Sequence, residues 1–261
     1  MKWAGRFVLV SFLLATSATS QIVRTWTPSP GGNNHWFADT NWTPEGVPGF
    51  EDIIIIGTNA NVLIERTVDI GGTLRWGGGN FSAAYPGLAG WTIAPGGTVE
   101  LHGPLQYSGQ LTNSGTLIVT NDAYIHQGIY SRLYNLTNGV IRLTGNNELR
   151  AYELNAWIEN RGLLLHEGFG STGTVRGTLY QYGTVEARGG MLLGRDYQWT
   201  GYDGGRYIGT GGEVRIQSTT LLQEGEFVGS NLWIYGYFGG TNRLLGEMTL
   251  ANGAAFSGDR A

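Results

Sequence analysis

The chain contains no cysteine, and its only lysine is Lys2. Without cysteine it can form neither disulfides nor thiolate metal sites, so its stability must come from backbone hydrogen bonds and packing. Charged residues make up only 14% of the 261 residues, and the net charge is −4. Because phosphate contacts need a basic surface, a nearly lysine-free acidic chain is not expected to bind nucleic acid.

Long hydrophobic runs are also missing. The mainly apolar run Phe7 to Ala15 follows Lys2 and Arg6 and precedes the small residues Ala18-Thr19-Ser20. That run is too short to cross the ~30 Å hydrocarbon layer of a bilayer. This order of basic, apolar and small residues predicts a signal peptide over residues 1–20, cleaved after Ser20. The mature chain is therefore expected to be secreted or at the cell surface, with no membrane span.

Proline is scarce, at 7 residues, whereas glycine is abundant, at 44. Together with Val, Ile and Thr, this composition predicts many short strands joined by tight turns. Six strand-like runs each begin with glycine, and the spacings between successive glycines are 18, 24, 23, 21 and 29. The runs are Gly97-Thr-Val-Glu-Leu101, Gly115-Thr-Leu-Ile-Val119, Gly139-Val-Ile-Arg-Leu143, Gly162-Leu-Leu-Leu-His166, Gly183-Thr-Val-Glu-Ala187 and Gly212-Glu-Val-Arg-Ile216.

Aligned on their glycines, these runs share one pattern of polarity. The second and fourth residues after glycine are apolar except for His166, and the third is often charged. Such alternation assigns positions two and four to the core and position three to solvent. Asn113, Asn138 and Asn160 shortly precede a glycine and are interpreted as turn residues that tolerate left-handed backbone angles. One coil of about 20 to 25 residues favours a parallel β-solenoid over an antiparallel sandwich or propeller.

Residues 21–50 differ from the rest because they are dense in Trp, Pro, Asn and Gly. Prolines and glycines break a helix, so we expect an irregular N-terminal cap, with Trp36 and Trp42 packed over the first strands. The solenoid is then expected over residues 51–261. An open last coil would expose strand edges, so its C-terminal end is expected to continue in further sequence or to be covered by a partner.

A family resemblance rests on the motif Trp36-Phe-Ala-Asp-Thr-Asn-Trp42, followed by Gly46-Val-Pro48 and Asp52. This stretch resembles the opening of exported bacterial β-solenoid proteins of the autotransporter-passenger-like (pectin-lyase-like) type. The motif itself is short, and the weak coil repeat extends the likeness along most of the chain. It implies a right-handed parallel β-helix, and it transfers no catalytic residues.

No reaction is indicated by the sequence. Its four histidines show no metal-binding spacing, and no serine lies in a Gly-x-Ser-x-Gly turn. The acids are scattered, and the outward column of Glu100, Arg142, Glu186 and Arg215 is explained by a solvated charged face. Neither metal nor cofactor is therefore expected. Because polysaccharide-cleaving enzymes are common among parallel β-helices, a polysaccharide lyase or glycoside hydrolase remains the alternative.

Aromatic residues mark the candidate binding site. The longest spacing, from Gly183 to Gly212, is interpreted as an insertion, and insertions in solenoids often project from the binding face. Aromatic rings beside Asp and Arg can stack on sugars and hydrogen-bond their hydroxyls. The competing interpretation is that the rings pack on the coil. The predicted ligand-binding residues are Trp199, Tyr202, Asp203, Arg206, Trp233, Tyr235 and Tyr237, the last three forming a second patch along the same face.

The sequence thus predicts a non-enzymatic structural or adhesive module that presents an elongated face to a glycan or another envelope protein. A passenger segment without a binding role of its own remains a third interpretation.

Overall fold

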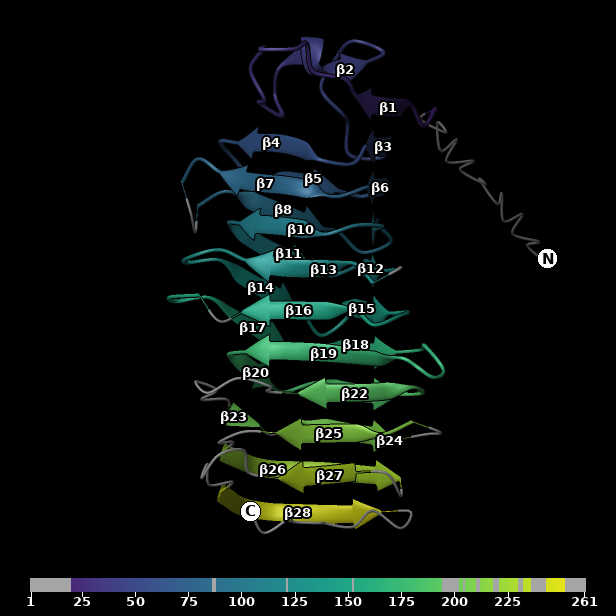
Figure 1. The fold of residues 1–261 in the computed structure, drawn as a ribbon, viewed down its shortest axis with the longest axis vertical. Coiled ribbons are helices and arrows are strands. Elements are labelled where there is room, and N and C mark those ends of the chain that lie inside the picture. The colour runs from purple at the N-terminus through teal and green to yellow at the C-terminus, as the bar shows by residue number, and fades with distance from the viewer. Residues whose placement is uncertain are drawn as a thin grey trace, which may run out of the picture.

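The computed structural model describes residues 20–85, 88–120, 122–151, 153–193, 202–203, 205–209, 212–217, 221–229, 232–235 and 243–251. In this part the chain is all-β apart from one 3-10 helix, η1 (Asp39–Asn41). Parallel strands form a β-solenoid, and most coils contribute one strand to each of three stacks (Figure 1). Two of these stacks are joined near the C-terminal end into one 19-stranded sheet, and the third is a 9-stranded sheet; we call each stack a sheet. As the chain descends, the front strands run left and the strands behind them run right, which makes the coil right-handed.

We number the sheets by their order within one coil. The first sheet stacks β3 (Ile53–Ile56), β6 (Thr73–Trp76), β9 (Thr98–Leu101), β12 (Thr116–Val119), β15 (Val140–Leu143), β18 (Leu163–His166), β21 (Thr184–Ala187) and β24 (Arg206–Gly209).

The second sheet stacks nine described strands: β4 (Ala60–Ile64), β7 (Gly79–Ala83), β10 (Leu105–Ser108), β13 (Tyr124–Gln127), β16 (Glu148–Ala151), β19 (Thr172–Gly177), β22 (Gly190–Leu193), β25 (Val214–Gln217) and β27 (Leu232–Tyr235). The third sheet stacks β5 (Val68–Ile70), β8 (Gly90–Ile93), β11 (Gln110–Asn113), β14 (Arg132–Asn135), β17 (Trp157–Asn160), β20 (Leu179–Gln181) and β23 (Tyr202–Asp203). The long strand β26 (Leu221–Gly229) pairs with both β23 and β24, and then with β28 (Arg243–Ala251).

Tryptophans form a small core at the N-terminal end. Strand β1 (Val23–Trp26) pairs in parallel with β3 and antiparallel with β2 (Trp42–Thr43). Trp26, Trp36 and Trp42 are buried, and the ring of Trp42 meets each of the other two edge-on, with centroids 4.9 Å apart. The Trp42 Nε1–H donates to the Trp36 carbonyl over 2.8 Å. The segment therefore covers the first coil as an irregular cap.

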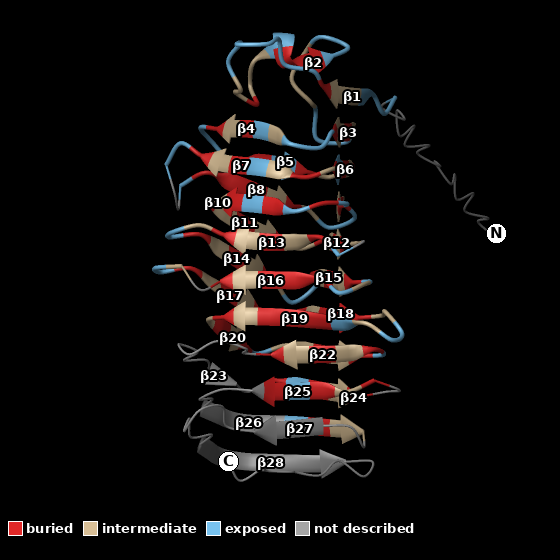
Figure 2. Ribbon diagram, in the orientation of Figure 1, coloured by how far each residue is buried: buried red, intermediate tan, exposed pale blue. Residues whose placement is uncertain are grey.

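The core lies inside the coils, and its register follows the glycine-led runs. The first five runs stack in the first sheet, so Val99, Leu117, Ile141, Leu164 and Val185 form one buried column. Figure 2 shows buried positions along the strands and exposed ones mainly in the connections. The predicted assignment of core and outward positions is confirmed for these runs, except that Leu165, a predicted outward position, is buried.

The alignment of the sixth run is wrong. Gly212-Glu-Val-Arg-Ile216 leads into β25, which pairs with β22 in the second sheet. The strand that stacks on β21 is β24, where Arg206 lies opposite Thr184, a spacing like those of the preceding coils. The long spacing from Gly183 to Gly212 therefore joins strands of two different sheets and is no evidence of an insertion. Any strand with one buried face shows the same alternation, so the pattern cannot tell which sheet a strand joins.

A buried amide ladder closes the corner between the third and first sheets. Asn113, Asn135, Asn160 and Gln181 end four successive strands of the third sheet and are fully buried. Each asparagine Nδ2 donates to the side-chain oxygen one coil on, over 2.8, 2.6 and 2.7 Å in turn. The same Nδ2 groups also donate to carbonyls of the first sheet. The turn interpretation of Asn113 and Asn160 is therefore wrong, because both lie in strands.

Candidate binding face

The predicted ligand-binding residues are spread over three sheets. Trp199 and Tyr237 lie outside the described residues. Tyr202 and Asp203 form β23 in the third sheet, whereas Trp233 and Tyr235 belong to β27 in the second. Arg206 lies in β24 of the first sheet, where its exposed side chain pairs with Glu226 over 2.8 Å. The described members of the two predicted patches thus lie on different sheets.

The third sheet instead carries an outward cluster of aromatic and charged side chains on β14, β17 and β20. The inward residues Leu133, Ile158 and Leu179 are buried, so their neighbours along each strand point outward and are partly exposed. We call this cluster, together with two residues that directly follow β17 and β20, the aromatic face: Arg132, Tyr134, Trp157, Glu159, Tyr180, Arg161 and Tyr182. Alternation in Arg132-Leu-Tyr134 and Trp157-Ile-Glu159 is the sequence signal for it. An alignment of only the glycine-led strand in each coil misses this signal.

Close contacts organise the aromatic face. The Arg132 guanidinium carbon lies 4.2 Å from the centroid of the Trp157 ring, and Trp157 meets Tyr180 edge-on at 6.4 Å. Arg132 and Trp157 are opposite each other in the ladder. The rings therefore lie on adjacent coils, which repeat at about 4.8 Å. A polymer lying across the strands would meet them in succession.

An apolar ridge borders this face at the corner with the second sheet. Ile129, Tyr130 and Leu154 lie in the connections that precede β14 and β17, and their exposed fractions are 50%, 49% and 64%. The Tyr130 amide donates to the Leu154 carbonyl over 2.9 Å, which joins the two connections. Arg132 and Trp157 follow Tyr130 and Leu154 closely along the chain, so the ridge and the aromatic face adjoin each other.

Charges on the other two sheets are largely compensated, both within a strand and between coils. In the second sheet Glu148 pairs with Arg150, 2.5 Å away, and with Arg176. In the first sheet Arg142 and Arg188 both bind Glu167. Such pairs support the prediction of a solvated charged face. Within the described residues, no three His, Asp or Glu side chains are placed to hold a metal ion.

His166 is a buried residue of the core, as its position in the repeat predicted. It is fully buried, and its Nε2 lies 3.0 Å from the Gly145 carbonyl and 3.3 Å from the Ser171 hydroxyl. A carbonyl only accepts, so Nε2 carries the proton, and Nδ1 has no hydrogen-bond partner in the described part of the chain. Burial lowers the pKa of His166, against the smaller raising effect of the Gly145 carbonyl.

This lowered pKa predicts a pH-dependent stability. The unfolded chain takes up a proton at His166 near pH 6.5, while the folded chain stays neutral until a lower pH. The free energy of unfolding should therefore fall with acidification from about pH 7.5 to about pH 5.5, by up to about 1.4 kcal/mol per pH unit from this residue. Urea unfolding of wild type and His166→Gln at both pH values measures it. The variant should lose less stability than wild type, and equal losses would contradict the assignment.

No described residue belongs to a helix with the length and hydrophobicity to cross a bilayer. Comparison of the chain with protein families, with curated proteins and with solved structures gave no match in any of the three.

Proposed function

We propose that the protein is an exported, non-enzymatic adhesive module that binds a glycan along the aromatic face. The observation that carries this proposal is the partly exposed Trp157, placed on a rigid sheet between Arg132 and Tyr180. Aromatic rings offer large apolar surfaces for the apolar faces of sugars, while the tyrosine hydroxyls and charged groups can bind sugar hydroxyls. Export rests on the basic, apolar and small residues that open the chain.

A linear polymer suits this face better than a small molecule. Small-molecule sites are concave and enclose most of their ligand, whereas the outward side of a stacked sheet is an open surface. Rings on successive coils provide repeated contacts along the solenoid axis. Each contact can be weak, because a polymer engages several of them together.

The enzyme alternative has less support from the described residues. Glycoside hydrolysis needs two carboxyl groups on either side of the bond that is cleaved. On the aromatic face Glu159 is bound by Arg161 over 2.5 Å, and on the second sheet Glu148 lies between two arginines. These pairings engage carboxylate oxygens that a nucleophile or an acid would have to present.

The proposal predicts that a glycan array retains the protein, and that Trp157→Ala combined with Tyr180→Ala weakens this binding. Aromatic residues at the centre of an interface commonly contribute about 2 kcal/mol or more, so we expect a loss of roughly 30-fold in affinity. Titrating the wild type and the double variant with the glycan that retains the protein on the array measures the loss of affinity.

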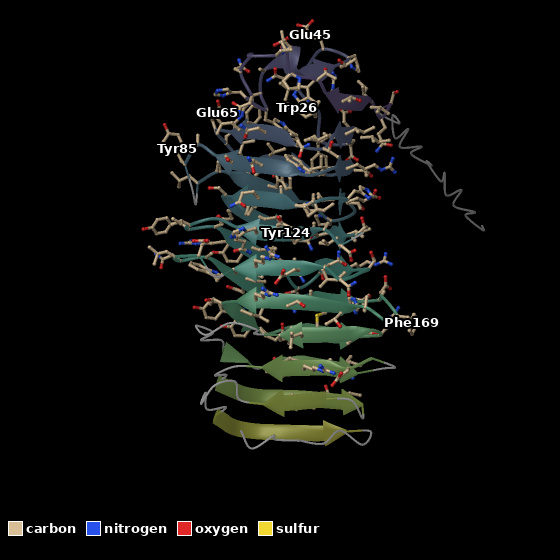
Figure 3. All side chains as sticks on the ribbon, in the orientation of Figure 1. Trp26, Glu45, Glu65, Tyr85, Tyr124 and Phe169 are labelled. Atoms are coloured by element: carbon tan, nitrogen blue, oxygen red, sulfur yellow. The ribbon has the colours of Figure 1, made fainter. Side chains whose placement is uncertain are left out.

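Tyr124→Ala is the matched control. Tyr124 lies on the second sheet, at the front in Figure 3, and Arg150 covers its ring at 4.2 Å as Arg132 covers Trp157. This variant should bind like wild type. An array that retains no wild-type protein, or equal binding by the double variant, would refute the proposed function.

A further inference from the structure

We infer that Arg132 makes the aromatic face selective for glycans that carry an anionic group. This inference rests on the proposed function and adds the chemical class of the ligand. The group would be a carboxylate, a sulfate or a phosphate, all of which a guanidinium binds through paired N–H donors.

The first observation is that Arg132 has no acidic partner in the described part of the chain. Across the described residues, Arg75 pairs with Glu100, 3.1 Å away, and Arg142 with Glu167, 2.5 Å away, whereas no carboxylate pairs with Arg132. Its Nε is buried and has no hydrogen-bond partner in the same part of the chain. The acid on the same face, Glu159, is already bound by Arg161. With respect to the residues that the structure describes, Arg132 therefore has unused hydrogen-bonding capacity.

The second observation is that the guanidinium of Arg132 lies beside the Trp157 ring, on which a sugar would stack. The guanidinium carbon lies 4.2 Å from the Trp157 centroid. A guanidinium donates in its own plane, so contact with a ring through one face leaves its edge N–H groups available. A sugar resting on the neighbouring aromatic surface would bring its substituents to this edge. Arg132 thus both extends the surface on which a sugar can stack and provides N–H donors for an anionic group.

The third observation concerns the charge of the molecule as a whole. The net charge is −4, and it becomes −6 when residues 1–20, which contain Lys2 and Arg6 but no acid, are left out. An acidic protein does not attract polyanions in general, so binding of an acidic glycan must come from a local site. Charges are screened beyond about 8 Å at physiological salt, and a local contact partly shielded from solvent still acts within that range.

The test uses an array that holds each polysaccharide backbone in neutral, carboxymethylated and sulfated forms, with dextran as one such series. Wild type is compared with Arg132→Gln and with the control Arg66→Gln. Arg66 is matched because its guanidinium carbon lies 4.1 Å from the Phe37 centroid and it, too, has no carboxylate partner among the described residues. It differs in lying on the connection between β4 and β5, three coils before β14.

We expect wild type to prefer the acidic forms, with sodium chloride weakening this preference. Arg132→Gln should lower affinity for the acidic forms about tenfold and leave any binding to neutral forms unchanged, while Arg66→Gln changes neither. The carboxymethylated and sulfated forms show which anion is preferred.

Equal retention of the protein on neutral and acidic forms, or equal affinities of the two arginine variants, would overturn the inference. If Trp157→Ala with Tyr180→Ala still weakens binding in that case, the proposed function stands. Retention of no form would refute both.

Discussion

Replacing Asn135 with alanine should lower the free energy of unfolding by about 3 kcal/mol, because each buried polar group left without a partner costs about 1 to 3 kcal/mol. Asn135 accepts a hydrogen bond from Asn113 and donates to Asn160 and to the Leu163 carbonyl. Alanine removes the middle of the amide ladder and leaves buried polar atoms on both sides unpaired. Urea denaturation followed by circular dichroism measures the change.

Asn138→Ala provides the matched control, because Asn138 is exposed in the turn that follows β14, the strand that ends at Asn135. We expect it to change stability by less than about 0.5 kcal/mol. A loss for Asn135→Ala no greater than the loss for Asn138→Ala would show that the ladder contributes no stability.

Gly162→Ala should also destabilise strongly, by about 3 kcal/mol or more, because it overpacks the backbone. A Cβ at Gly162 would lie 2.2 Å from the Gly139 carbonyl oxygen and 2.4 Å from that of Leu136. Both obstacles are backbone atoms of the preceding coil, which cannot move without separating the coils. Comparable close approaches explain why the strands of the first sheet from β6 to β24 each begin directly after a glycine.

Gly57→Ala separates this steric effect from the general effect of replacing glycine. A Cβ at Gly57 meets no atom within 4 Å. That change should be neutral or stabilising by up to about 1 kcal/mol, because alanine restricts the unfolded chain. Thermal unfolding of both variants provides the comparison. If Gly162→Ala melted like Gly57→Ala, the coils would not be in the close contact described.

Most of the architecture could be predicted from the glycine-led runs. Their alternation identified the buried column that contains Val99, Leu117 and Ile141 because inward and outward residues must differ in polarity. The same rule failed at Gly212, since alternation is common to all three sheets. The turn preference of asparagine misplaced Asn113, because an asparagine near a glycine usually indicates a turn. Only the stacking of coils shows that its amide is satisfied by Asn135.

The candidate site was less predictable than the fold. Trp157 and Arg132 are a full coil apart in sequence and become neighbours only through the ladder between β14 and β17. A length difference between repeats directed attention to the stretch between Gly183 and Gly212 instead. The ordinary spacing from Thr184 to Arg206 removes that reason. Tyr202 and Asp203 nevertheless belong to the sheet that carries the aromatic face, one strand beyond β20.

Hydroxyl-radical footprinting tests most directly whether the aromatic face is the binding surface. It is done with and without the glycan that retains the protein best on the array. Trp157, Tyr180 and Tyr182 should be protected from oxidation when the glycan is bound. Tyr124 on the second sheet and Phe169, which is 84% exposed at the opposite side of the solenoid (Figure 3), should be oxidised as before. Protection of Tyr124 or Phe169 with no protection of Trp157 would contradict the account.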